Sequence, residues 1–424
     1  MAARFHKSAV IVFLLCGFCV CKADAEEIFT WEDCAREAAA HNPELISAAE
    51  DVMQAKADKA IVRSAGLPQL GSSASRKKTK AATSDPKDSY SYSLSAQQLL
   101  FDGFKLSNDV WAAKKTLSAQ EYNLAVVSSD VRLNLRTAFA SLLRAQELIS
   151  LTDEIAARRK QNLELVQLRY NAGREHSGAL LTAKADLAQA EFEVAQAERN
   201  LLLTQRTLLK EMGHQLFVAL NARGDFAITE NDAEKPDFDT LVDTTPFLKR
   251  LVAQKEAARY DYAAAKADFF PKVYLDGGFG QSAASWPPNQ DDWSAGVSVS
   301  FPLFEGGSRI AQASKAKSQL RQAQADERSG RDSVIVTLEQ AWKQFRDAID
   351  TVAVKEKFLR AAQERAQIAN AQYSTGLISF NDWIIIEDNL VNAKKAFLDA
   401  QANLLIAEAG WVQAKGGTLE YAKQ

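Results

Sequence analysis

Apolar residues follow a helical period over long stretches of this chain. In the second half they recur at spacings of four and three residues, at Val334, Leu338, Ala341, Phe345, Ala348 and Val352. A matching series in the first half runs through Val131, Leu135, Ala138, Leu142, Ala145 and Ile149. Such spacing predicts helices with one apolar seam. Each series lies in a proline-free stretch of about 65 residues, which as a helix would be about 100 Å long.

A second pattern, with a period of two, precedes each long helix. Trp293, Ala295, Val297, Val299 and Phe301 alternate with small polar residues, and so do Tyr90, Tyr92, Leu94 and Ala96. Alternation of this kind predicts strands with one apolar and one polar face. We expect two hairpins, with strands at about 69–79 and 89–100 in the first half and at about 272–281 and 292–303 in the second.

Glycines mark the ends of the long helices. Tyr170-Asn171-Ala172-Gly173 ends the first helix and Tyr373-Ser374-Thr375-Gly376 ends the second. Glycine after the last periodic residue is a common helix stop. Because another helical segment follows each stop, we expect two antiparallel helical hairpins, at about 103–212 and 306–414.

The two halves are related by one constant offset of 203 residues. This offset aligns prolines, glycines and aromatic residues, such as Pro68 with Pro271, Phe101 with Phe304 and Gly213 with Gly416. A period this long indicates a duplicated domain rather than a short-repeat solenoid. The expected units are residues 26–231 and 232–424, each with the order helix, β-hairpin, very long helix, returning helix. The fold class is mainly α with a small β part.

The N-terminal segment has the residue pattern of an export signal. Basic residues precede an apolar run from Ala9 to Val20, and Ala23-Asp24-Ala25 supplies a cleavage pattern. About 12 apolar residues are too few for a transmembrane anchor, so we expect a signal peptide at residues 1–25. A lipoprotein signal is the alternative, which leaves acylation of the N-terminus open. Cys34 alone remains after cleavage, so no internal disulfide is expected.

Composition and charge exclude several classes. The net charge of -3 disfavours a nucleic-acid partner, and 47% hydrophobic residues exclude wholesale disorder. The four histidines are too scattered for a metal cluster, and no motif for a catalytic nucleophile or a phosphate loop is found in its proper context. We therefore expect no enzyme activity, no cofactor and no metal.

The aromatic face of the hairpins is typical of a membrane-facing sheet. Four strands cannot close a membrane barrel, which needs at least about eight, and an open sheet would leave unpaired edges in lipid. Several chains sharing one barrel would resolve this conflict. Three chains with four strands each would give 12 strands.

These motifs, in order and in both halves, resemble the TolC-like outer membrane efflux family, also called outer membrane factors. The resemblance covers residues 27–416. It rests on the duplicated exported chain, the Asn42–Leu45 start, Leu67–Leu70 and Phe270–Val273 before the strands, Leu100–Gly103 and Leu303–Gly306 after them, and the two hairpin tips. It implies a homotrimer of a Gram-negative outer membrane, with a 12-stranded β-barrel in the lipid and an α-helical barrel crossing the periplasm.

The resemblance also implies partners and a function. Such a channel-tunnel docks a periplasmic adaptor (membrane fusion protein) and an inner-membrane transporter, in a tripartite efflux or type I secretion system, and catalyses no reaction. A periplasmic adaptor-like protein is the main alternative, although adaptors usually carry one helical hairpin. A structural coiled-coil protein is a second alternative, which the strands with an aromatic face count against. The sequence does not indicate which substrate is exported, or which pump and which adaptor take part.

The hairpin tips are the candidate site. The resemblance places Gly173 and Gly376, with Tyr170 and Tyr373, where the adaptor contacts the helices, and Asp382 where relatives often carry a gate aspartate. Plain helix termination is the alternative for the glycines, and a helix N-terminal residue is the alternative for Asp382.

The tip also departs from the family pattern. Ile385 stands where a second gate acid would fall, and Leu377 and Ile378 replace a latching arginine, which puts any particular latch in doubt. Glu387 and Asp388 could line the lumen, but a solvated helix face is the more common role for such charges.

Overall fold

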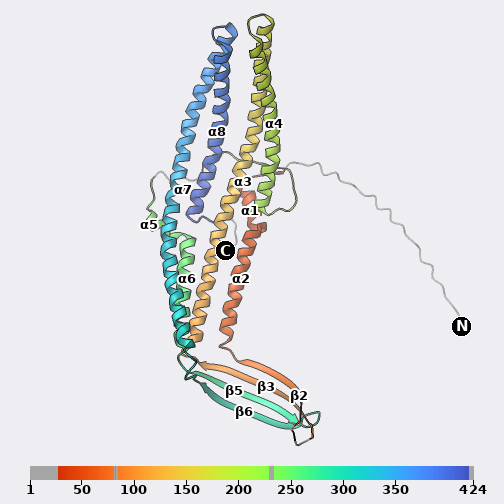
Figure 1. Cartoon of the computed structure of the whole chain (residues 1–424), viewed down its shortest axis with the longest axis vertical. Helices are drawn as coiled ribbons and strands as arrows, with labels where there is room; N and C mark the ends of the chain where they lie inside the picture. The colour runs from red at the N-terminus through yellow and green to blue at the C-terminus, as the bar shows by residue number, and fades with distance from the viewer. Residues whose placement is uncertain (1–26, 81, 83–84, 229–233, 420–424) are drawn as a thin grey trace, which may run out of the picture.

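The computed structural model describes residues 27–80, 82, 85–228 and 234–419. The molecule is elongated, with a β-sheet at one end, helices along its length and two helical tips at the other end (Figure 1). The expected signal peptide at 1–25 and the expected boundary between units at 231/232 lie outside the described residues.

Two very long helices form the frame of the molecule, as the apolar seams predict. Helix α3 (Lys105–Asn171) has 67 residues and α7 (Ser308–Thr375) has 68. Each turns at its tip into a returning helix, α4 (Ser177–Met212) or α8 (Phe380–Ala414). Shorter helices α2 (Pro43–Ser64) and α6 (Pro246–Ala267) accompany the halves nearer the sheet. The helices therefore pack in the order α2–α3–α6–α7 near the sheet and α4–α3–α8–α7 near the tips (Figure 1).

The predicted seams lie on the inward faces of these helices, with their residues buried or partly buried. Val131, Leu135, Leu142 and Ala145 of α3 are fully buried, as are Leu338 and Phe345 of α7. The first series packs with α1 (Trp31–His41) and α4, and the second packs with α5 (Phe238–Leu241), α6 and α8, so that two separate cores form midway along the molecule. A third core joins the two hairpins at their tips. Burial of one apolar stripe per helix holds the helices together.

The sheet has four antiparallel strands in the order β2–β3–β5–β6. Their bounds are Gln69–Thr79, Lys87–Phe101, Lys272–Ala283 and Gln290–Ser300. The two predicted hairpins pair with each other through β3 and β5, so β2 and β6 are the edges. Strands β3 and β6 both start earlier than expected, which shortens the two outer loops. At the end nearer the helices, β6 ends at Ser300 rather than at about 303.

The two faces of the sheet differ in polarity. The register places Leu94 opposite Phe279, and Phe279 opposite Trp293, on one face. The other face carries mostly Ser, Gly and Gln around Asp276, which accepts hydrogen bonds from Gln97 at 2.8 Å and from Ser298 at 2.5 Å. In this single chain all residues of β2 and β6 are exposed.

Several short elements at mid-height were not predicted. They are β1 (Glu27–Phe29), α1 (Trp31–His41), β4 (Leu220–Ala222), α5 (Phe238–Leu241) and the 3₁₀ helix η1 (Val242–Thr244). Helix α1 begins at a capping box between Thr30 and Asp33. Strand β1 pairs in parallel with β4, which lies almost 200 residues away, and local patterns do not report such pairing. None of the helices in the described part of the chain combines the length and apolarity needed to cross a membrane.

Candidate gate at the helical tips

Both tip glycines adopt a backbone conformation that favours glycine. Gly173 has φ of 69° and Gly376 has φ of 83°, both in the left-handed region. A Cβ at Gly173 would meet no atom within 4 Å, so backbone conformation rather than crowding accounts for the glycine. Helix termination therefore explains both glycines structurally. Contact with an adaptor is a separate hypothesis.

Tyr373 is the centre of an aromatic and ionic cluster that joins the two hairpins. Its ring is fully buried and stacks on Trp383, with 4.2 Å between ring centroids. Arg169 of α3 lies 4.5 Å from the ring centroid and donates a hydrogen bond to the Tyr373 carbonyl at 2.7 Å. The Tyr373 hydroxyl donates to Glu175, at the first tip, at 2.9 Å. Burial and the neighbouring Glu175 carboxylate raise the pKa of the tyrosine.

The two tip tyrosines therefore differ, although the duplication aligns them. Tyr170 is exposed, which suits a residue that contacts a partner. Tyr373 has no exposed surface in this structure, so its expected role as an adaptor contact is not supported. The physical reason is that Arg169, Glu175 and Trp383 surround its ring. The cluster of Arg169, Glu175, Tyr373 and Trp383 is called the tip clamp below.

Asp382 lies exposed in the first turn of α8. Its carboxylate accepts a hydrogen bond from the Ser379 hydroxyl at 2.7 Å, and its backbone N–H donates to the Ser379 oxygen at 3.2 Å. This is an N-terminal cap, which the helix dipole favours. The carboxylate remains exposed beside the tip, so capping and a role at an entrance are compatible.

A buried ion pair joins the hairpins about two helical turns from the start of α8. Glu387 is only 1% exposed and accepts two hydrogen bonds from Arg158, at 2.5 and 2.8 Å. These bonds raise the pKa of Arg158. Asn162 adds a longer contact of 3.4 Å. The interpretation of Glu387 as part of a solvated helix face is therefore wrong, because α3 covers it.

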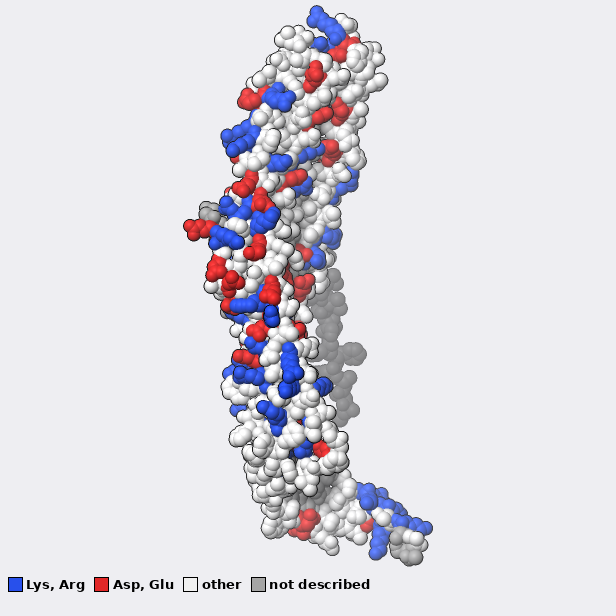
Figure 2. Space-filling model, turned by 60° about the vertical axis from the view of Figure 1, so that its left-hand side comes forward, with Lys and Arg blue, Asp and Glu red and all other residues white. Residues whose placement is uncertain are grey.

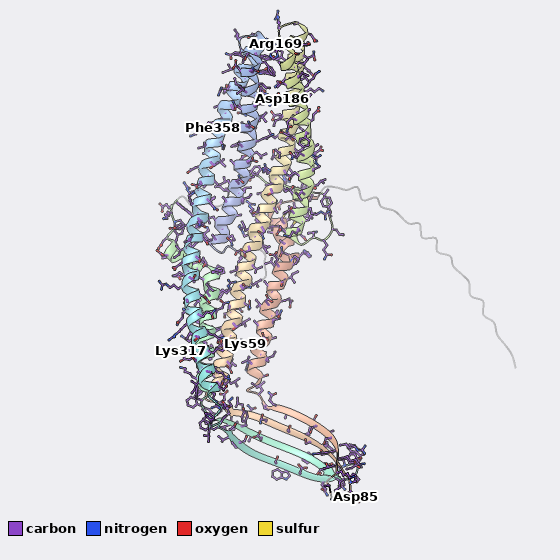
Figure 3. The ribbon with its side chains drawn as sticks, viewed as in Figure 1. Lys59, Asp85, Arg169, Asp186, Lys317 and Phe358 are labelled. Atoms are coloured by element: carbon purple, nitrogen blue, oxygen red, sulfur yellow. The ribbon has the colours of Figure 1, made fainter. Side chains whose placement is uncertain are left out.

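Further charged contacts lie along the seam between α3/α4 and α8, and Figure 3 labels Asp186 of α4 below the tips. Arg159 contacts Asp388, and Asp186 of α4 lies near both. Burial raises the pKa of Asp186, and one of its oxygens is buried without a hydrogen-bond partner. The contacts that run along the seam away from the tips are Glu193–Lys395, Glu154–Lys394 and Arg144–Asp399. The hairpins are thus held together by a row of charges below the tip clamp.

The sequence carries little signal for this network. Arg158 and Glu387 are 229 residues apart, and Arg169 and Tyr373 are 204 apart. No pattern in a single sequence pairs charges across such distances. Only the run Arg174-Glu175-His176, directly after the first stop, indicates polar groups at the tip.

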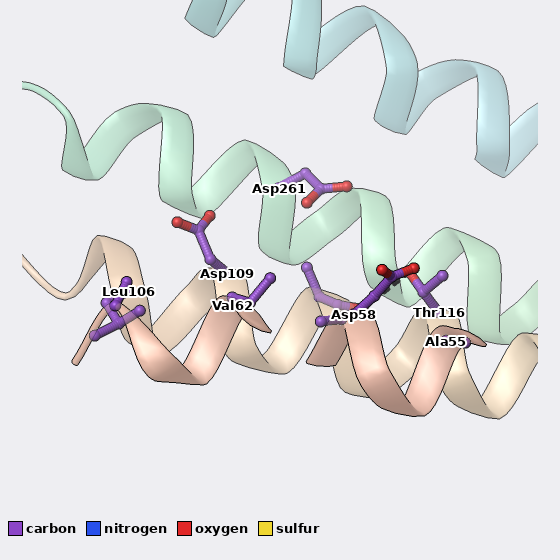
Figure 4. Close-up of a pocket in the computed structure, with 10 residues that line it drawn as sticks. Ala55, Asp58, Val62, Leu106, Asp109, Thr116 and Asp261 are labelled. Atoms are coloured by element: carbon purple, nitrogen blue, oxygen red, sulfur yellow. Dashed lines mark hydrogen bonds between the residues drawn. The ribbon is translucent and has the colours of Figure 1, made fainter. Parts of the chain in front are cut away.

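An open hollow of about 520 Å³ lies at the opposite end of the helices, between α2, α3 and α6. Asp58, Asp109 and Asp261 come from the three helices and face it (Figure 4). Asp109 pairs with Lys105 at 3.2 Å, and burial raises the pKa of Asp261. Within the described ranges, no group of three or more His, Cys, Asp or Glu side chains could hold a metal ion. The hollow is a feature of the helical wall.

Three features define the structural class of this protein. They are a duplicated chain with two long helical hairpins, a four-stranded sheet with one apolar and one polar face, and two tips joined by the tip clamp. A family model for "outer membrane efflux protein" matches residues 34–214 and again 240–417. The chain belongs to the outer membrane efflux protein family and is located in the outer membrane.

Individual relatives are distant in sequence but similar over most of their length. BepC, an outer membrane efflux protein of Brucella suis biovar 1, is 24% identical over 84% of this chain and 78% of BepC. AprF, an alkaline protease secretion protein of Pseudomonas aeruginosa, is 24% identical over 77% of this chain and 68% of AprF. A crystal structure of CusC superposes with a TM-score of 0.82 at 18% identity, covering 91% of this chain and 92% of that chain.

Proposed function

We propose that three copies of this chain form one export channel, in which the sheets close into a 12-stranded barrel in the outer membrane and the helices form a tunnel across the periplasm. The observation that carries the proposal is the four-stranded sheet with two unpaired edges and two unlike faces. In lipid, unpaired edges are costly, and a closed barrel removes them. Three sheets of four strands give the even strand number of such barrels.

The apolar face carries the features of a lipid-facing surface. Trp293 is 79% exposed, and Val297 and Val299 continue the same face toward the helices. Aromatic residues lie at both ends of the sheet, with Tyr90 against Trp286 at the outer end and Phe101 against Phe104 at the helical end. Two aromatic bands around an apolar zone are typical of barrels in bilayers. The face with Asp276 would then line the lumen.

The edges of the helical wall also support association. Exposed apolar residues follow α2 and α4 on one edge and α7 on the other, although a monomer in water gains nothing from them. They are Ile46, Met53 and Ile61 on α2, Leu181, Phe192 and Leu203 on α4, and Val336, Val354, Phe358 and Ile368 on α7. In a ring of three copies, the α2/α4 edge meets the α7 edge of the next copy.

The tips form the entrance in this proposal. Tyr170, Gly173 and Gly376 lie exposed around the two turns, where a periplasmic adaptor could reach them, and an inner-membrane transporter would supply substrate and energy. We assign the chain no catalytic role and no cofactor. The named relatives include an efflux protein and a protease secretion protein, so both drug-type efflux and type I secretion suit the fold.

The first test is the native mass of the protein extracted from outer membranes. We expect about 130 kDa after correction for detergent, which is three chains of 46.6 kDa each less the signal peptide. Ion conductance in planar bilayers should accompany that species. A water-soluble species that needs no detergent would contradict the barrel and favour the adaptor-like alternative.

Replacing Asp382 with asparagine tests the entrance. Three carboxylates around a narrow pore favour cations. We expect the Asp382→Asn channel to lose cation preference, seen as a shift of the reversal potential toward zero under a salt gradient. Asp399→Asn, far from the tip on the same helix, is the matched control. Unchanged selectivity in Asp382→Asn would leave Asp382 with its capping role alone.

A further inference from the structure

The two edge strands carry opposite charges at the same end of the sheet. Strand β2 ends with Arg76, Lys77 and Lys78, and Lys80 follows it. Strand β6 begins with Gln290, Asp291 and Asp292. Lys and Arg side chains gather at the end of the sheet that lies away from the helices (Figure 2). Asp85, between β2 and β3, marks this outer end in Figure 3.

The strand register places both sets of charges toward the outer end of the sheet, with Lys77 three residues further out than the level of Asp291. Thr79 pairs with Lys87, Tyr90 with Ala283, and Ser282 with Gln290, so the end of β2 and the start of β6 lie at the same end of the sheet. They are nevertheless three strand spacings apart, about 14 Å, because β3 and β5 lie between them. Within one chain the two sets of charges do not meet.

Most of these charges have no opposite partner in the described part of the chain. Arg76 contacts Asp88 of its own hairpin at 3.5 Å. By contrast, Lys77, Lys78 and Lys80 form no ion pair there, and Asp291 and Asp292 contact no cation. Among the described residues, Asp291 accepts a hydrogen bond from the neutral Gln281 side chain and from no cation.

We infer that, in the trimer, the basic end of β2 pairs with the acidic start of β6 on the neighbouring copy, so that Lys77, Lys78 and Lys80 face Asp291 and Asp292 across each barrel seam. This inference rests on the proposed trimeric channel. Strand directions alternate through the sheet, so β6 runs antiparallel to the β2 of the next copy, and both outer ends lie at the same rim of the barrel. The pairing requires a stagger of three residues or more between these two strands, and closing a sheet into a barrel imposes such a stagger. A closed three-fold ring repeats the same seam three times.

The register between β6 and the β2 of the next copy must be set by contacts between chains, unlike the register of the strand pairs within one chain. Short loops within one chain connect β2 to β3 and β5 to β6, and contacts within the same chain, such as the Gln97–Asp276 hydrogen bond, join β3 to β5. No turn joins β6 to the β2 of another copy. A slip by one residue there would turn the apolar face of one strand toward the lumen. Opposite charges at one end of the two edge strands oppose such a slip, because only the correct register brings them together.

The test uses charge reversal in the full-length protein, extracted from outer membranes, with the dissociation temperature of the trimer as the readout. One variant reverses Lys77, Lys78 and Lys80 to Glu, a second reverses Asp291 and Asp292 to Lys, and a third combines both. We expect each single set to lower the dissociation temperature by about 5 °C or more and the combined variant to recover most of that loss.

Lys87→Glu supplies the matched control. Lys87 lies at the same end of the sheet but on the inner strand β3, where it pairs with Thr79 of its own chain. Combining Lys87→Glu with the reversed aspartates should give no recovery. If the falls in dissociation temperature of the lysine set and the aspartate set simply add when both sets are reversed, the inference is wrong. A loss from the lysine set alone that depends on anionic lipid would also overturn it and would assign the lysines to lipid phosphates.

Cysteine pairs keep the inference testable if the reversed variants do not assemble. Lys80→Cys with Asp291→Cys in one chain should give chains cross-linked to one another on oxidation, since a disulfide does not span about 14 Å within a chain. Cys34 is buried and does not compete. If trimers form but show neither cross-links nor recovery of the dissociation temperature in the combined variant, the charge pairing between copies is wrong and the proposed channel still stands. Absence of a wild-type trimer would refute the channel itself.

Discussion

Replacing Glu387 with alanine should open the contact between the two helical hairpins. The change leaves the Arg158 guanidinium partly buried without its bidentate partner. Removing one member of a buried pair costs about 3 kcal/mol, which corresponds to a rise of about 100-fold in local opening. Hydrogen exchange of the α8 peptides around residues 383–391, measured on the detergent-purified protein, should show this loss of protection.

Two further variants separate the buried pair from general effects of mutation. Asp399 lies on the same helix as Glu387, and Asp399→Ala removes its partly exposed contact with Arg144 of α3, for which we expect a cost of less than about 1 kcal/mol. The double replacement Arg158→Met with Glu387→Leu should recover much of the lost protection, because it leaves no unpaired charge. Equal protection in Glu387→Ala and the wild type would mean that the pair does not hold the hairpins together.

Replacing Arg169 with alanine should loosen the tip clamp and raise conductance. The change removes a hydrogen bond to the Tyr373 carbonyl, a cation–π contact and the ion pair with Glu175 at 3.8 Å. These contacts together are worth about 2 kcal/mol, which would shift a two-state tip equilibrium by about 30-fold. Single-channel recordings in planar bilayers should show a higher open fraction, and Tyr373→Phe, which loses one hydrogen bond, a smaller increase.

Arg174→Ala is the matched control for this experiment. Arg174 is an exposed arginine of the same tip, and its only hydrogen bond in the described part of the chain is made by its backbone N–H. Its conductance should match that of the wild type. An equal increase in both arginine variants would point to loss of surface charge rather than to the clamp.

The duplication explains why the two tips share a shape but not a chemistry. Both long helices end at a glycine in the left-handed region, which depends on local backbone preference. The tyrosines three residues before these glycines have different neighbours, because only Tyr373 meets Arg169 and Glu175 of the other hairpin. A repeat in sequence therefore predicts the framework of each unit and not the contacts between units.

The sequence by itself determined the long helices, their glycine stops, the two hairpins and the family, because each depends on periodicity or on motifs within a short stretch. The seam from Val131 to Ala145 is an example, since each position that the helical period predicts there is buried. Only the tertiary structure decided that Glu387 is buried against Arg158, that Tyr373 is enclosed, and that β1 pairs with β4. These features join residues about 200 positions apart, and which of many similar charges or strands meet depends on how the whole helices and hairpins pack.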